Sequence, residues 1–208
     1  MNIIDRLATS LGRRDEVPNQ ELAKDVAARE DKNAVREVVE NLAHKSKDIQ
    51  NDCIKVLYEI GAVKPKLIAP YLKDLLPLLE SKNNRLQWGA MTALGCIANE
   101  KPAEIFAVLG KIVDAADKGS VITRDHCVNI LISLTALGTY REKTFPLLIE
   151  QLMTCPANQL PMYAENALPV IDAGLKDKFV KTLAGRLGQL EKESQRKRVE
   201  KVIRKLSK

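Results

Sequence analysis

The triplet Asp125, His126 and Cys127 places a carboxylate, an imidazole and a thiol side by side, which is the set that an activated thiol nucleophile requires. Successive side chains on a helix point about 100° apart, so three neighbours cannot easily share a proton. Cys127 also falls in a repeating position that is held elsewhere by Cys53, Ala90 and Ala164. A small buried core residue is therefore the favoured interpretation of Cys127, and no catalytic residue is assigned.

The sequence also lacks the motifs of a metal site or a nucleotide site. The candidate soft ligands are Cys53, Cys96, Cys127, Cys155, His44 and His126. They form neither a CxxC pair nor a Cys/His set with the spacing of a metal site, and the sequence has neither GxGxxG nor GxxxxGK spacing. We expect no metal and no cofactor, and the unpaired cysteines favour a reduced, cytoplasmic protein. Since the sequence has no secretory signal pattern and no apolar run of about 18 residues, we also expect no membrane insertion.

The elements that would carry these residues are helices. Hydrophobic residues make up 45% of the 208 residues and aromatic residues only 4%, which favours helix over strand. Apolar residues return every 37 residues in two stripes, each with the offsets of three and four residues that define one helix face. The first stripe is Val35, Leu72, Leu109, Pro146, Leu183; Val38, Leu75, Ile112, Ile149; and Leu42, Leu79, Ala116, Met153, Leu190. The second is Leu57, Leu94, Leu131, Leu168; Cys53, Ala90, Cys127, Ala164; and Ile60, Ile97, Leu134, Ile171.

Each repeat is thus predicted to be a pair of amphipathic helices. The predicted pairs are 33–44 with 47–61, 66–80 with 84–98, 103–117 with 121–136, 141–154 with 159–173, and 177–191 with 194–207. Helices near 2–12 and 20–30 precede them outside the 37-residue register, as expected for a degenerate N-terminal cap. The expected helix-capping residues are Asn33, Ser46, Asn84, Ser120, Asn158 and Ser194.

The segments YLKDLLPLLES at 71–81 and NRLQWGAMTALGCIA at 84–98 resemble a HEAT repeat. The family's Leu-Leu-Pro-Leu-Leu stretch is matched at 75–79, and its Ala-Leu-Gly at 93–95. Most of the family's turn Asp and inner-helix Arg positions are filled differently, so a divergent or armadillo-leaning array is the alternative. The resemblance implies an all-α, right-handed α-α superhelix of about five helix pairs. We expect one solenoid domain over 1–208, with cap helices in 1–32, repeats over 33–190 and a basic capping helix over 191–208.

Stacked helix pairs would present one exposed row of each inner helix along a concave wall. The residues predicted to bind a partner there are Asn51, Lys55, Tyr58, Trp88, Arg124, Asp125, His126, Asn129, Met162 and Tyr163. The sixteen positions of this inferred wall hold one lysine, whereas aromatic, Met and Asn side chains suit a protein or peptide interface. Trp88, Tyr58 and Tyr163 are the predicted anchors, although each could instead pack between repeats.

The C-terminal end carries most of the net charge. Residues 191–208 contribute +5 of the formal +6. The predicted basic patch is Arg196, Lys197, Arg198, Lys201, Arg204 and Lys205. A solvated capping helix is the favoured interpretation, and binding of nucleic acid or of an acidic partner is the alternative.

The function predicted from these patterns is a non-catalytic protein-binding scaffold. A nucleic-acid-binding HEAT-like protein is the first alternative, similar to the HEAT-like alkylpurine DNA glycosylases, with Asp125 beside Trp88 as the nearest analogue of their site. The basic lining of those enzymes is absent. A repeat subunit of a lyase or assembly factor, resembling phycobilin lyases, is the second alternative. The partner's identity and the oligomeric state stay open.

Overall fold

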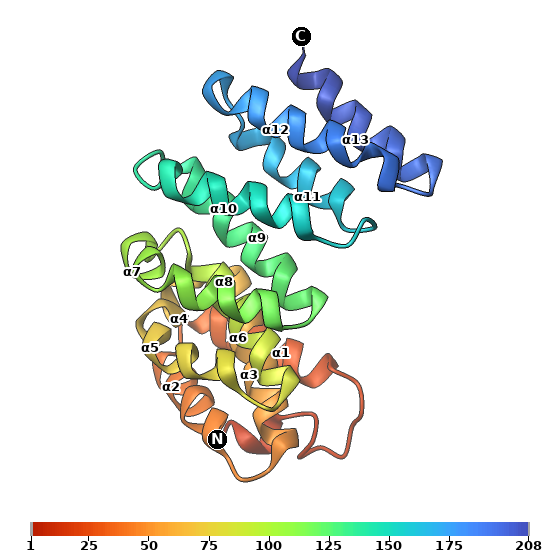
Figure 1. Cartoon of the computed structure of the whole chain (residues 1–208). Coiled ribbons are helices and arrows are strands. Elements are labelled where there is room, and N and C mark those ends of the chain that lie inside the picture. The colour runs from red at the N-terminus through yellow and green to blue at the C-terminus, as the bar shows by residue number, and fades with distance from the viewer. Residues whose placement is uncertain (1, 208) are drawn as a thin grey trace. The chain divides into compact units, whose positions relative to one another are not determined.

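The computed structural model describes residues 2–207, and within this range every regular element is a helix (Figure 1). The chain has the HEAT/armadillo-like helical-repeat fold of an α-solenoid. It packs as two compact units, Met1–Cys127 and Val128–Lys208, which divide within helix α9.

The elements of the first unit, with α9, are η1 (Ile4–Arg6), α1 (Val17–Arg29), α2 (Lys32–Glu40), η2 (Asn41–Ala43), α3 (Lys47–Val63), α4 (Pro65–Ile68), η3 (Ala69–Tyr71), α5 (Leu72–Leu75), η4 (Leu76–Glu80), α6 (Asn84–Ile97), α7 (Pro102–Ala107), α8 (Leu109–Lys118) and α9 (Val121–Ala136). Those of the second are α10 (Arg141–Thr154), α11 (Leu160–Ala167), η5 (Leu168–Val170), α12 (Ala173–Arg186), η6 (Leu187–Gln189) and α13 (Glu193–Leu206). The predicted inner helices 47–61, 84–98 and 121–136 correspond to α3, α6 and α9 to within two residues.

The predicted apolar stripes form the core of each unit. Leu57, Leu94 and Leu131 have no exposed surface, and the same is true of Cys53, Ala90, Cys127 and Ala164. Burying side chains of this kind is the main favourable term in folding. Three positions of the predicted stripes are not buried, namely Pro146, Met153 and Leu168.

The stripe on α10 is rotated by one residue from its predicted position. Phe145 and Leu152 are buried in place of Pro146 and Met153, Leu148 is buried beside the predicted Ile149, and Met153 is 61% exposed. Leu152 and Met153 are both apolar, so the sequence pattern does not distinguish which of the two faces the core. The prediction that Met153 lies in the core was wrong.

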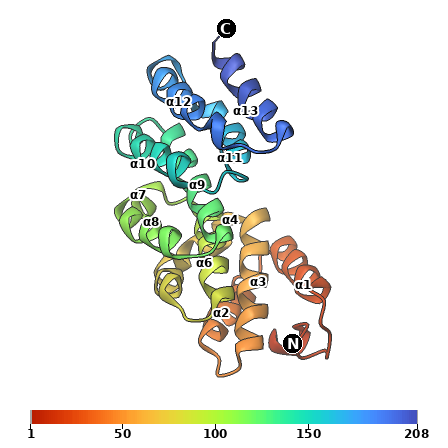
Figure 2. The ribbon, with the colours of Figure 1, turned by 45° about the vertical axis from the view of Figure 1, so that its right-hand side comes forward.

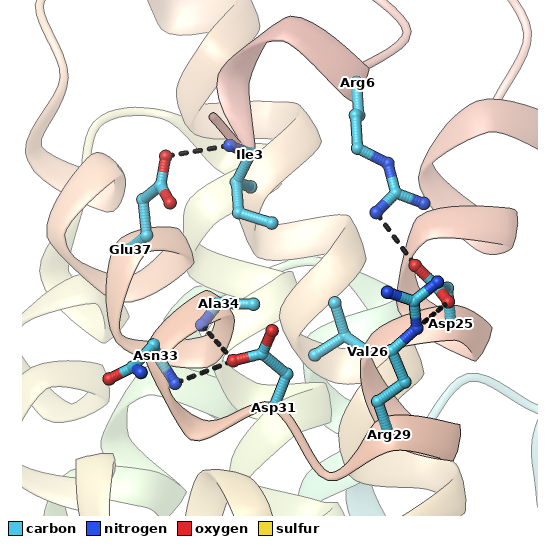
Figure 3. Close-up of a pocket in the computed structure, with 9 residues that line it drawn as sticks. All are labelled: Ile3, Arg6, Asp25, Val26, Arg29, Asp31, Asn33, Ala34 and Glu37. Atoms are coloured by element: carbon cyan, nitrogen blue, oxygen red, sulfur yellow. Dashed lines mark hydrogen bonds and ion pairs between the residues drawn. The ribbon is translucent and has the colours of Figure 1, made fainter. Parts of the chain in front are cut away.

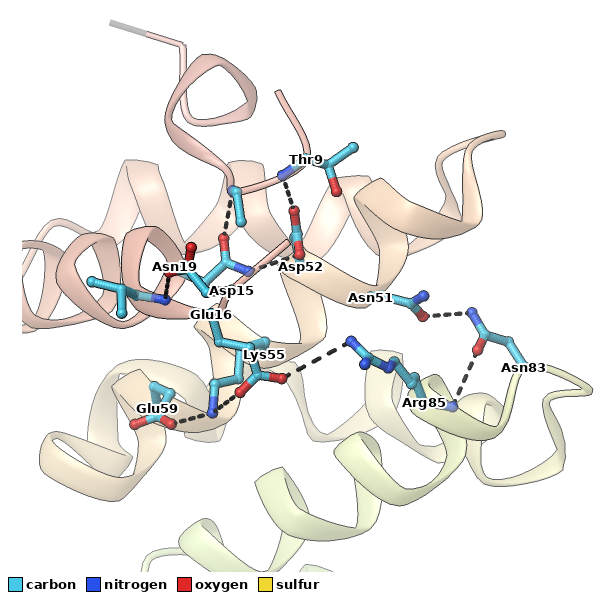
Figure 4. Close-up of polar contacts among 12 residues, drawn as sticks. Thr9, Asp15, Glu16, Asn19, Asn51, Asp52, Lys55, Glu59, Asn83 and Arg85 are labelled. Atoms are coloured by element: carbon cyan, nitrogen blue, oxygen red, sulfur yellow. Dashed lines mark hydrogen bonds and ion pairs between the residues drawn. The ribbon is translucent and has the colours of Figure 1, made fainter. Parts of the chain in front are cut away.

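The predicted helix at 2–12 was also wrong, because only the short η1 forms there. Leu7 is extended, with φ −70° and ψ 149°. The backbone N–H groups that would continue a helix donate instead to side chains: that of Ala8 to Asn19 Oδ1 at 2.9 Å, and that of Thr9 to Asp52 Oδ2 at 2.8 Å. Asn19 Nδ2 in turn donates to Asp52 Oδ1 at 2.7 Å (Figure 4). These bonds to side chains of α1 and α3 satisfy the two N–H groups without a helical turn.

Two predicted outer helices are interrupted. Segment 66–80 is divided into α4, η3, α5 and η4, with Pro70 and Pro77 early in the two 3-10 segments, because proline supplies no N–H to an α-helical turn. Segment 103–117 is divided into α7 and α8 at Val108.

Several helices are capped by residues other than those predicted. Helix α12 starts four residues before its predicted start, because Asp172 Oδ1 accepts from the backbone N–H groups of Gly174 and Leu175. Asp31 caps α2 in place of Asn33, and Asn83 caps α6 in place of Asn84.

Side-chain hydrogen bonds join neighbouring repeats at a nearly constant separation along the chain. Asn83 bonds Gln50, 33 residues earlier; Arg186 bonds Leu152, 34 residues earlier; and Arg198 bonds Glu165, 33 residues earlier. Within each unit, these bonds join a helix to one about a repeat earlier in the chain. In the part of the chain that the structure describes, no helix is both long and apolar enough to span a bilayer.

Candidate functional site

Helices α3 and α6 approach closely enough to bring two aromatic rings together. A Cβ atom added at Gly89 of α6 would lie 2.5 Å from Ile54 Cγ1 of α3, so glycine is what permits this approach. The rings of Tyr58 and Trp88 then lie 5.7 Å apart between centroids and are tilted by 49°. Both side chains are half-buried. Helices α1, α3 and α6 follow one another side by side (Figure 2).

Lys55, one helical turn before Tyr58, is held in place by two carboxylates. Its Nζ lies 3.0 Å from Glu16 Oε2 and 2.7 Å from Glu59 Oε1 (Figure 4). The same atom lies 4.9 Å from the centroid of the Tyr58 ring. Burial opposes the charged ammonium, but hydrogen bonds with Glu59, Tyr58 and Glu16 outweigh it and raise the pKa of Lys55. The side chain of Lys55 is 12% exposed. Lys55 therefore orders the surface that carries Tyr58 and Trp88, the aromatic face, more than it offers a free charge.

A polar edge borders the aromatic pair. Asn83 Nδ2 donates to Asn51 Oδ1 at 3.0 Å and to Gln50 Oε1 at 3.2 Å. Arg85 is 55% exposed at its side chain, and its Nη1 lies 4.0 Å from Glu16 Oε1. A cavity of about 540 Å³ opens beside Asn51 and Arg85, under the 8–16 segment. The aromatic pair, the amides and this cavity therefore all belong to the first unit.

The triplet on α9 is not arranged for catalysis. Burial raises the pKa of the Cys127 thiol to about 12, and the negative charge of Asp117 adds to this effect. Burial lowers the pKa of His126, against the opposing charge of Asp125. Arg124 Nη2 lies 3.4 Å from Asp117 Oδ1, and the Arg124 side chain is 17% exposed. The prediction that Cys127 is a core residue is confirmed by its complete burial.

The second unit holds the other three predicted binding residues. Asn129 and Asn166 are exposed, and Asn166 Nδ2 donates to Asn129 Oδ1 at 3.4 Å. Met162 is half-buried. Tyr163 is 1% exposed, so the prediction of an exposed anchor at this position was wrong. Its place in the 37-residue register is shared by Asp52, Gly89 and His126. Asp52 and Gly89 are also buried and face α1 and α3, whereas His126 is half-buried.

The basic patch on α13 is partly occupied within the protein. Arg198 forms two bonds with Glu165, at 2.9 and 2.6 Å; Lys197 pairs with Glu193 at 2.7 Å; and Arg196 donates to the Leu190 carbonyl at 3.1 Å. Lys201, Arg204 and Lys205 are exposed. Val199 and Val202 on the opposite face are buried, so the apolar side of α13 is covered by its own unit.

In a second cavity of the first unit, charged side chains of the lining are paired with one another. It measures about 490 Å³ and lies between η1, the end of α1 and the start of α2 (Figure 3). Asp25 is paired with both Arg6 and Arg29, at 2.9 and 2.7 Å, and Glu37 accepts from the backbone N–H of Ile3. Residues 2–207 contain no cluster of His, Cys, Asp and Glu that could hold a metal ion.

Sequence reasoning missed the residues that set the electrostatics of the aromatic face. Glu16 belongs to the N-terminal segment, outside the 37-residue register, so periodicity could not place it beside Lys55. Glu59 could have been found, because it lies four residues after Lys55 on the same helix, where opposite charges attract.

Comparison with known proteins supports the fold. No family model matches the chain, and no curated protein matches it. Among solved structures, it is similar over its whole length to an engineered protein, with a TM-score of 0.64, 18% identity and 97% of that chain covered. It is also similar to the designed armadillo repeat protein YIII(Dq)4CqI, with a TM-score of 0.61, 16% identity and 98% of each chain covered. Another designed armadillo repeat protein, solved in complex with the peptide (KR)4, has a TM-score of 0.63, 16% identity and the same coverage.

Proposed function

We propose that this chain is a non-catalytic scaffold that binds a peptide segment of a partner protein, and that Tyr58 and Trp88 supply the anchoring contacts. The observation that carries the proposal is the tilted, half-buried ring pair on α3 and α6, fixed by the close approach at Gly89. Rigid aromatic side chains lose little entropy on binding and dominate many interfaces.

The polar neighbours of the ring pair suit a peptide. Asn83 holds the Asn51 amide in place through its Nδ2, and the amide donor of Asn51 can match a backbone carbonyl of an extended segment. Lys55, Glu16, Glu59 and Arg85 balance one another in charge, so the face lacks the positive excess that phosphate backbones require. A designed armadillo repeat protein of the same fold holds a peptide, which is consistent with this use of the architecture.

The non-catalytic part of the proposal rests on the thiols. Burial raises the pKa of Cys53 and Cys127 to about 12 and that of Cys96 to about 11, so thiolate is scarce at neutral pH. Cys127, the one thiol beside a histidine in sequence, is fully buried.

The test is selection of peptide ligands from a random displayed library against the folded chain. Dissociation constants are then measured for the wild type, Trp88→Ala, Tyr58→Ala and a matched control, Val63→Ala, which truncates an exposed apolar residue at the end of α3. We expect each aromatic substitution to weaken binding at least about tenfold, as loss of an interface anchor does, and the control to leave binding within about twofold. Trp88 is the sole tryptophan, so its fluorescence reports contact directly.

The proposal fails if the selected peptides bind Trp88→Ala and Tyr58→Ala as tightly as the wild type. It fails equally if Trp88 fluorescence is unchanged at saturating peptide.

A further inference from the structure

The second unit carries an apolar groove of about 520 Å³ between α10 and α12, helices that lie side by side in Figures 1 and 2. Ile149 and Met153 of α10 form one wall, and Thr182 and Gly185 of α12 form the other. Met153 is 61% exposed because the apolar stripe of α10 is rotated toward Leu152. A Cβ atom added at Gly185 would meet nothing within 4 Å, so the groove is open at that point.

The charged residues that line this groove are all positive. Lys178 and Lys181 line it and are exposed, and neither forms an ion pair among the contacts of the described residues. No acidic side chain belongs to the groove lining. An anionic group entering beside either lysine therefore meets positive potential without a competing carboxylate.

Arg186 adds a nearly buried cation to the same groove. It is 9% exposed, and its guanidinium donates to neutral acceptors: Nη1 to the Leu152 carbonyl at 2.7 Å and to Cys155 Sγ at 3.2 Å, and Nε to Gln189 Oε1 at 2.8 Å. No carboxylate pairs with it within the part of the chain that the structure describes. A buried charge without a counter-charge is costly, and a carboxylate from a ligand would lower that cost.

We propose that the α10–α12 groove binds an acidic amphipathic segment of a partner protein. One large apolar side chain of that segment would enter at Gly185 against Met153 and Ile149, and its flanking Asp or Glu side chains would meet Lys178, Lys181 and Arg186. This combination of apolar anchor and charge is how helical segments commonly bind grooves between helices. The proposal uses none of the residues around Tyr58 and Trp88, so it stands or falls independently of the peptide site there.

The experiment follows the methyl group of Met153 by NMR in the full chain, labelled at methionine methyls and assigned with Met153→Leu. The probe is a synthetic helical peptide with two leucines one turn apart and glutamates beside them. Two matched peptides replace the glutamates by lysines or the leucines by alanines. We expect a saturable shift of the Met153 methyl with the first peptide, and binding at least about tenfold weaker with each matched peptide.

Variants of the chain distinguish binding in the groove from non-specific binding of the peptide. Gly185→Leu fills the opening and Lys178→Glu with Lys181→Glu reverses its charge, so we expect each to weaken binding at least about tenfold. Gly185→Ala, which has room for its methyl group, is expected to retain binding and confirms that α12 tolerates substitution.

The inference is overturned by equal binding of the lysine peptide, by binding that survives Gly185→Leu, or by the absence of a saturable shift up to about millimolar peptide. A Met153 shift that inorganic phosphate reproduces in full would assign the groove to simple anions and would also refute the proposal.

Discussion

Gly89→Ala tests the close approach of α3 and α6, on which the aromatic pair depends. The added Cβ would lie 2.5 Å from Ile54 Cγ1, which is 0.9 Å short of the 3.4 Å at which ordinary contact begins. Overpacking of this kind costs about 1–3 kcal/mol, whereas replacing glycine by alanine within a helix gains about 1 kcal/mol. We therefore expect Gly89→Ala to destabilise the chain by about 1 kcal/mol.

The effect of Gly89→Ala on the free energy of unfolding should change sign when the Ile54 side chain is truncated. Ile54→Ala deletes both crowded γ carbons and costs about 2–5 kcal/mol by itself. In that background Gly89→Ala meets no γ carbon and keeps its helical gain, so we expect it to stabilise by about 1 kcal/mol. The coupling energy of the cycle is then about 2 kcal/mol.

Urea unfolding followed by circular dichroism and by Trp88 fluorescence measures all four variants. Gly185→Ala is the matched control, because it adds a methyl group to a helix where nothing lies within 4 Å, and it should stabilise by up to about 1 kcal/mol. A coupling energy below about 0.5 kcal/mol would refute the reasoning that Ile54 and Gly89 set the distance between α3 and α6.

Three further outcomes follow from the charges and thiols. Hydrogen bonds from Arg198 lower the pKa of Glu165, so this pair stabilises at neutral pH and its contribution fades as acid protonates Glu165; the difference in Tm between wild type and Glu165→Gln should shrink below about pH 4. Burial lowers the pKa of His126, so the folded chain binds fewer protons there than the unfolded chain; the loss of stability as the pH falls below about 6.5 should be smaller in His126→Asn. Cys96, which is half-buried, should react with a thiol reagent faster than the fully buried Cys127, as mass spectrometry of partly labelled protein would show.

The periodicity of apolar residues predicted most of the fold because it indicates which side chains are buried. Leu57, Leu94 and Leu131 recur at one spacing and occupy equivalent fully buried positions, so one measure found the helices, their faces and the repeat. It could not resolve a rotation of a single residue. Where two adjacent residues are both apolar, as at Leu152 and Met153, the choice between them is made by tertiary packing.

The candidate site was predicted in part. Tyr58 and Trp88 were placed on one face by helical spacing alone, and the structure brings their rings together. Tyr163 was misplaced: it is 1% exposed, and an isolated helix projection does not include burial against neighbouring elements. Lys55 was predicted as a partner-binding residue, but it pairs with Glu16, which lies in a segment that shares no register with the repeats.

The nearly constant separation of the bonds between neighbouring repeats has a consequence for how the chain reaches its native state. Bonds such as those between Asn83 and Gln50 or between Arg198 and Glu165 each close a loop of about one repeat. The entropy lost in closing a loop depends on its length, so adding each helix pair to a folded neighbour costs about the same. Such a topology has low contact order, which favours rapid folding that begins at any well-packed pair and spreads outward in both directions.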